Sequence, residues 1–129
     1  MIIGLVTLFY LIYNNNNLNI MRVFFIGCSY SFGQLFVGLY WISFAFEFTM
    51  NAGILVGLIA VLILAIFLSI FIGISCALSK YLSDLWNLNV FGFALLFSSL
   101  LSMSEYLRGN LFGGFPWNIL GYIWSESYI

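Results

Sequence analysis

The stretch AGILVGLIAVLILAIFLSIFIGISCALS, residues 52–79, contains no charged side chain. A helix that crosses a bilayer needs about 20 consecutive, mainly apolar residues, so this segment is long enough to span with some tilt. Backbone N–H and C=O groups find no water in hydrocarbon, and a helix pairs them internally. The segment therefore predicts a transmembrane helix.

The rest of the chain has the same character. Of its 129 residues, 64% are hydrophobic, 21% aromatic and 5% charged, and the mean hydropathy is +1.15. Ordinary soluble domains carry roughly 25% charged residues, so this chain lacks the side chains to cover a surface in water. We expect an all-α membrane protein with the bilayer as its solvent.

Four apolar segments, separated by polar connections, predict a bundle of about four transmembrane helices. They occupy approximately residues 1–13, 23–46, 52–79 and 90–108. The first is short for a full crossing, and it lacks the basic start and small-residue cleavage site of a signal peptide. Residues 109–119, which hold the only proline, are expected to form a loop.

The few charges predict how these helices are oriented. Arg22 and Lys80 lie in the first and third connections, which alternating crossings place on one side. The second connection holds Glu47 and no cation. Positively charged connections remain in the cytoplasm, so the loop 109–119 is expected at the outer face.

Composition disfavours several kinds of chemistry. The chain has no histidine, and its two cysteines, Cys28 and Cys76, lie inside apolar segments. A thiol in such surroundings is inert, so we interpret both as packing residues, and we expect no metal and no cofactor. A net charge of -1 without basic patches indicates that nucleic acid is not a partner.

Small and polar residues form stripes on the second and third segments. Steps of three and four residues place each set on one helical face. Lipid offers helices no hydrophobic reason to associate, so small residues that let backbones approach mark helix contacts. The two sets are Gly27, Ser31, Gln34, Gly38, Trp41 and Ala45, and Gly53, Gly57, Ser69, Gly73 and Ala77.

The stretch EYLRGNLFGGFPWN, residues 105–118, begins with a carboxylate and a guanidinium. Glu105 and Arg108 are separated by one helical turn, so the two side chains can meet on a helix surface. Arg108 also suits the negative end of the helix dipole. An ion pair that caps a helix end is one interpretation of this spacing.

The same stretch continues with a rigid turn. Gly113 and Gly114 permit backbone angles that other residues avoid, and Pro116 holds the residue before it extended. Trp117 is then expected at headgroup depth. Tyr40 and Trp41, near the outer end of the second segment, either belong to an interfacial aromatic belt or line a lipid cleft with Trp117.

Two motifs resemble one known family, the bacterial apolipoprotein N-acyltransferases. EYLRGNLFGGFPWNILGY, residues 105–122, is similar to the signature of that family, and SYSFGQLFVGLYWIS, residues 29–43, is similar to a segment that precedes it. Gly113 departs from the signature, since Thr or Ser is usual there. The matching positions in the signature are Glu105, Tyr106, Leu107, Arg108, Gly109, Phe112, Gly114, Phe115, Pro116, Trp117, Asn118, Gly121 and Tyr122.

The resemblance implies an enzyme that transfers an acyl chain from a phospholipid to the N-terminal diacylglyceryl-cysteine of a lipoprotein. Family members combine membrane helices with an outer nitrilase-like α/β domain, whose Glu-Lys-Cys set performs covalent catalysis. We expect that domain to be absent here, so the chain is interpreted as an inactive membrane fragment. The resemblance also implies the bacterial inner membrane, with the motif loop on the periplasmic face.

The residues expected to form a floor beneath such a domain, where lipid tails enter, are Glu105, Arg108, Gly114, Pro116, Trp117, Tyr40 and Trp41. The charged pair would hold the outer end of the fourth segment. Alternatively, Arg108 would contact a phospholipid phosphate, for which a guanidinium is suited.

The sequence alone is also compatible with a different class of protein. A chain of 129 residues is long enough for a small non-catalytic membrane scaffold or subunit. A transporter or channel is disfavoured, because apart from Gln34 the segments offer little polar lining and no charge near mid-membrane.

Overall fold

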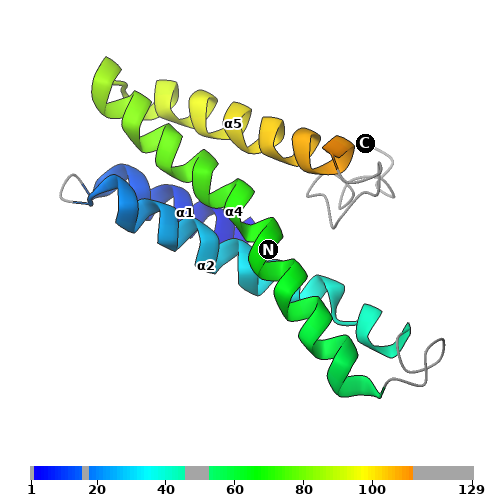
Figure 1. Ribbon diagram of the computed structural model, residues 1–129. Helices are drawn as coiled ribbons and strands as arrows, with labels where there is room; N and C mark the ends of the chain where they lie inside the picture. The colour runs from blue at the N-terminus through cyan, green and yellow to red at the C-terminus, as the bar shows by residue number, and fades with distance from the viewer. Residues whose placement is uncertain (1, 16–17, 46–52, 112–129) are drawn as a thin grey trace.

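The computed structural model describes residues 2–15, 18–45 and 53–111, and the regular structure in these residues is helical. The helices, in chain order, are α1 (Ile2–Asn14), α2 (Ile20–Leu39), α4 (Ile54–Trp86) and α5 (Val90–Leu111) (Figure 1). Among the described residues, three helices, α2, α4 and α5, are long and apolar enough to cross a membrane, whereas α1 has only 13 residues. The all-α membrane fold expected from the sequence is confirmed.

The second apolar segment is divided in the structure. Helix α2 ends at Leu39, Tyr40 and Trp41 form a turn, and residues 42–45 are helical again. The backbone N–H and the hydroxyl of Ser43 both donate to the Tyr40 carbonyl, at 3.0 and 2.7 Å. These two bonds close the turn, and residues 42–45 then lie beside the N-terminal part of α4, where Gly57 meets the backbone of Ser43 (Figure 1).

Helix α4 continues through Trp86 and then reverses sharply into α5. Asn87 adopts a left-handed backbone with φ of 49° and donates its N–H to the Ser83 carbonyl. Asn tolerates this conformation better than most residues do. The Leu88 N–H reaches the same carbonyl at 3.1 Å, and the Asn89 side chain accepts the Gly92 N–H at 2.8 Å. The connection between α4 and α5 is therefore a tight, capped turn.

The contact between α2 and α4 is the most extensive in the bundle, and small residues lie at its centre. A Cβ placed on Gly27 would lie 2.8 Å from the Cys76 Sγ and 3.1 Å from the Gly73 Cα. A Cβ on Gly73 would overlap the Cys28 Sγ. The two backbones thus approach as closely as glycine allows, which is how helices associate in lipid.

The predicted stripes describe this contact in part. The structure buries Gly27, Ser31, Gly57, Ser69 and Gly73. It leaves Trp41 58% exposed, because the turn at the end of α2 redirects the chain before the stripe is complete.

Helices α1 and α5 pack beside this pair through aromatic rings. Phe9 of α1 lies 5.1 Å from Phe93 and 5.7 Å from Phe97, measured between ring centroids. Between α4 and α5, the Ser75 hydroxyl donates to the Leu100 carbonyl at 3.2 Å. The resulting core contains Leu8, Ile12, Val23, Ile72, Cys76, Phe93, Phe97 and Leu101.

A glycine substitution tests the contact between residues 42–45 and α4. A Cβ on Gly57 would lie 2.5 Å from the Ser43 carbonyl oxygen and 2.8 Å from its Cα, and backbone atoms cannot turn away. We expect Gly57→Ala to lower the free energy of unfolding by about 1–3 kcal/mol, as overpacking does. The measurement is a denaturant titration in detergent micelles, followed by circular dichroism.

Gly33→Ala is the matched control, because nothing lies within 4 Å of the added Cβ in α2. Its effect should stay within about 0.5 kcal/mol of zero. Equal losses for the two variants would contradict the packing described here.

Candidate functional site

Arg108 lies in the last turn of α5 and is buried, with 2% of its surface exposed. Glu105, one turn earlier on the same helix, is half-buried, and its carboxylate interacts electrostatically with the guanidinium. A charge at the bilayer centre costs about 2.5–3.5 kcal/mol on insertion scales. The nearby carboxylate and the end of the helix both reduce that cost for Arg108.

The hydrogen bonding of Arg108 is incomplete. Its Nε is buried and has no hydrogen-bond partner in the part of the chain that the structure describes. A guanidinium carries five N–H donors, and a buried donor left without an acceptor costs about 1–3 kcal/mol. The Nε donor of Arg108 therefore has unused hydrogen-bonding capacity.

Tyr30 of α2 connects the charged pair to the rest of the bundle. Glu105 interacts electrostatically with the phenol. On the α1 side, a Cβ on Gly4 would lie 2.9 Å from the Tyr30 ring. The sequence patterns do not single out Tyr30, although it precedes Ser31 of the predicted stripe. A phenol inside an apolar helix, which needs a polar partner when buried, was the available signal.

Tyr40 and Trp41 lie in the turn after α2 and are 43% and 58% exposed. The Tyr40 ring meets Phe44 edge to face, with 5.4 Å between centroids. Figure 1 shows this turn beside the N-terminal part of α4, well separated from the end of α5. The described residues therefore do not bring Tyr40 and Trp41 together with Glu105 and Arg108.

The remaining predicted site residues, Gly114, Pro116 and Trp117, lie outside the described residues. The beginning of the expected loop is helical, because α5 continues to Leu111. The Asn110 amide supports this last turn by donating to the Tyr106 carbonyl at 2.8 Å.

A second charged pair lies near the opposite end of α5. Lys80 was expected in a cytoplasmic connection, but it belongs to α4 and is 4% exposed. Its Nζ lies 2.8 Å from the Asp84 Oδ1, one turn along the same helix. Among the described residues no group of three or more His, Cys, Asp or Glu is placed to hold a metal ion.

Three long apolar helices with mostly apolar side chains on their exposed faces, and an ion pair within the last two turns of α4, define a multi-pass α-helical membrane protein. The family model for the apolipoprotein N-acyltransferase N-terminal domain matches residues 1–129. The chain belongs to this family.

One curated relative carries the name of this family. It is an apolipoprotein N-acyltransferase from Rhodopseudomonas palustris, and it is 33% identical over 103 residues, which are 80% of this chain. The match spans 18% of the relative's own length. No solved structure matches the chain.

The electrostatic link between Glu105 and Arg108 generates a stability prediction. In Glu105→Gln the buried guanidinium keeps its charge and loses its nearby anion, so we expect the free energy of unfolding to fall by about 1–3 kcal/mol. In the double variant Glu105→Gln/Arg108→Met no charge remains at this end of α5, and stability should return toward that of the unmodified chain. Denaturant titration in micelles measures both, and additive losses would show that the two side chains are not coupled.

Proposed function

We propose that this chain is the membrane part of an apolipoprotein N-acyltransferase. Such an enzyme transfers an acyl chain from a phospholipid to the N-terminal diacylglyceryl-cysteine of a lipoprotein. The observation that carries the proposal is the family match over residues 1–129. The printed name of the Rhodopseudomonas palustris relative supports it.

The role assigned to the chain is to build the membrane platform. Covalent acyl transfer needs an activated nucleophile with a base close by. Cys76 is 0% exposed in the core, and Cys28 lies half-buried against α4, so neither thiol is assigned a catalytic role. We place the acyl-transfer chemistry in the part of such an enzyme that this chain does not match, and we expect these 129 residues alone to be inactive.

Within the platform, Glu105 and Arg108 act as positioning residues for the motif that follows them. The pair fixes the last turns of α5, after which the motif continues from residue 112 to residue 122. Gly114, Pro116 and Trp117 would then contribute to a floor where lipid tails enter, and the exposed Tyr40 and Trp41 would face the same lipid layer. The buried Nε of Arg108, which lacks an acceptor among the described residues, would be satisfied by a backbone carbonyl of that floor or by a phosphate oxygen.

Activity of the full-length enzyme tests the positioning role. We expect Arg108→Ala and Trp117→Ala each to lower kcat for acyl transfer to a diacylglyceryl lipopeptide by about 10- to 100-fold, because a misplaced floor misaligns the reacting groups. Arg108→Lys keeps the positive charge but removes the planar guanidinium, so it distinguishes a need for charge from a need for two parallel hydrogen bonds. The control is Arg22→Ala, which removes an exposed cation from α2. Normal folding and normal transfer in both alanine variants would refute the floor.

The location of the motif is tested separately by labelling in intact bacterial cells. We propose the inner membrane, with the end of α5 on the periplasmic face and Arg22 in the cytoplasm. Asn110→Cys, at an exposed position in the last turn of α5, should react with a membrane-impermeant maleimide in cells whose outer membrane is permeabilised. Arg22→Cys should react only after lysis, and the reverse pattern would overturn the assigned orientation.

A further inference from the structure

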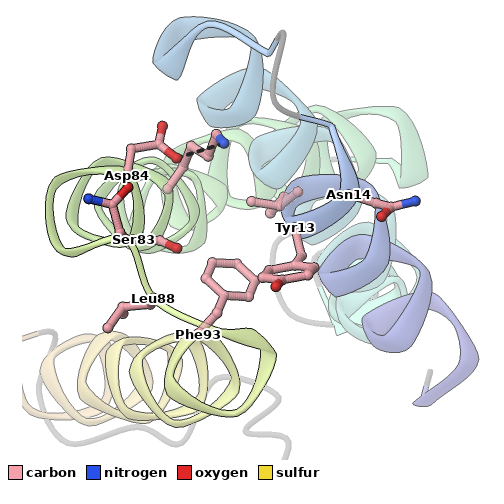
Figure 2. A pocket seen from close by; sticks show the side chains of 9 residues that line it. Tyr13, Asn14, Ser83, Asp84, Leu88 and Phe93 are labelled. Atoms are coloured by element: carbon pink, nitrogen blue, oxygen red, sulfur yellow. Dashed lines mark hydrogen bonds and ion pairs between the residues drawn. The ribbon is translucent and has the colours of Figure 1, made fainter.

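A cavity of about 320 Å³ lies at the end of the bundle where α1 and α4 terminate and α5 begins. Figure 2 shows its walls: Tyr13 and Asn14 come from α1, Ser83 and Asp84 from α4, and Phe93 from α5. Its volume is at the lower limit for small-molecule sites. Because α4 and α5 are candidate membrane spans, their joined ends place this cavity near a membrane surface.

One wall of the cavity carries both signs of charge. The side chain of Lys80 is 5% exposed and that of Asp84 is 57% exposed, so the cation is deep and the anion is at the rim. An ammonium has three N–H donors, and among the described residues Asp84 is the acceptor that Lys80 contacts. The ammonium and the second carboxylate oxygen both retain capacity for a ligand.

A neutral hydroxyl lies beside these charges. Figure 2 shows the Ser83 side chain directed toward the space between α4 and the rings of Tyr13 and Phe93. The Ser83 carbonyl is occupied by the N–H groups of Asn87 and Leu88. Ser83 lines the cavity, and a hydroxyl can both donate to and accept from a ligand. The rings of Tyr13 and Phe93, with centroids 5.4 Å apart, form an apolar wall of the cavity.

Helix ends of both polarities meet at the cavity. Helices α1 and α4 end there with a partial negative charge, whereas α5 begins there with a partial positive charge. Asp84 and the two C-termini favour a ligand cation, whereas Lys80 and the N-terminus of α5 favour a ligand anion. A purely anionic ligand would meet the repulsion of Asp84 as well as the attraction of Lys80.

We propose that this cavity binds the headgroup of a zwitterionic phospholipid of the phosphoethanolamine class. The phosphate would bind the free donors of Lys80 and the Ser83 hydroxyl, and the ammonium would bind Asp84 at the rim. The apolar side chains of Leu11, Leu85 and Trp86, on the adjoining turns of α1 and α4, are exposed and offer a surface for the acyl chains. This site lies at the end of α5 opposite to Arg108 and does not depend on the proposed acyl transfer.

The test measures lipid binding to the full-length protein in detergent by native mass spectrometry. We expect phosphatidylethanolamine to bind about 10-fold more tightly than phosphatidylglycerol, and Lys80→Gln to weaken phosphatidylethanolamine binding by about 10-fold. Arg22→Gln is the matched control, because it removes an exposed cation that does not line the cavity. Equal binding of the two lipids to the unmodified protein, or equal effects of the two variants, would overturn the proposal.

A second variant keeps the test decisive if Lys80→Gln fails to fold. Asp84→Asn alters the exposed rim and leaves the Lys80 cation unopposed, so the preference should shift toward phosphatidylglycerol. An unchanged preference would refute the charge assignment. Soluble phosphoethanolamine distinguishes the source of the ligand: weaker binding than the lipid supports a membrane ligand, whereas equal binding would overturn the lipid assignment.

Discussion

The close backbone approach of α2 and α4 is the contact on which the rest of the bundle depends. In lipid, helices gain nothing from burying apolar surface, so they associate where backbones come near enough for dispersion and polar contacts to add up. Gly27 and Gly73 provide that approach, with no room for a Cβ on either. Once this pair is fixed, α5 follows through the tight turn at Asn87, and α1 packs through the ring of Phe9.

The sequence predicts the helices better than it predicts their ends. Apolar runs reveal α2, α4 and α5 because hydrocarbon demands them. The predicted third helix ended at residue 79 because the apolar run stops at Lys80. In the structure Lys80 pairs with Asp84, and α4 continues to Trp86. The turn at Tyr40 and Trp41 contains neither glycine nor proline, so the local sequence does not predict it. It accompanies the packing of residues 42–45 against α4.

The candidate site is predictable to a similar degree. The one-turn spacing of Glu105 and Arg108 indicates that the two charges interact, and the structure shows that interaction. The burial of Arg108 and the electrostatic link of Tyr30 to Glu105 are tertiary properties, set by how α2 and α5 each pack against α4. Neither follows from local spacing. The cavity at the other end of α5 could not be predicted from the sequence either, because its walls come from α1, α4 and α5, and α1 is distant from the other two in the sequence.

The two charged pairs together fix the depth of α5 in the membrane. Its 22 residues extend for about 33 Å, close to the hydrocarbon thickness of about 30 Å. Lys80 and Asp84 lie near its beginning, and Glu105 and Arg108 lie in its last turns, so each pair stands near one membrane surface. Sliding the bundle by a single turn, about 5.4 Å, would draw one pair toward hydrocarbon, where each charge costs about 2.5–3.5 kcal/mol. The depth at which α5 ends beyond Arg108 is thus set by charges near both surfaces, which gives the few charged residues of so apolar a chain a structural role.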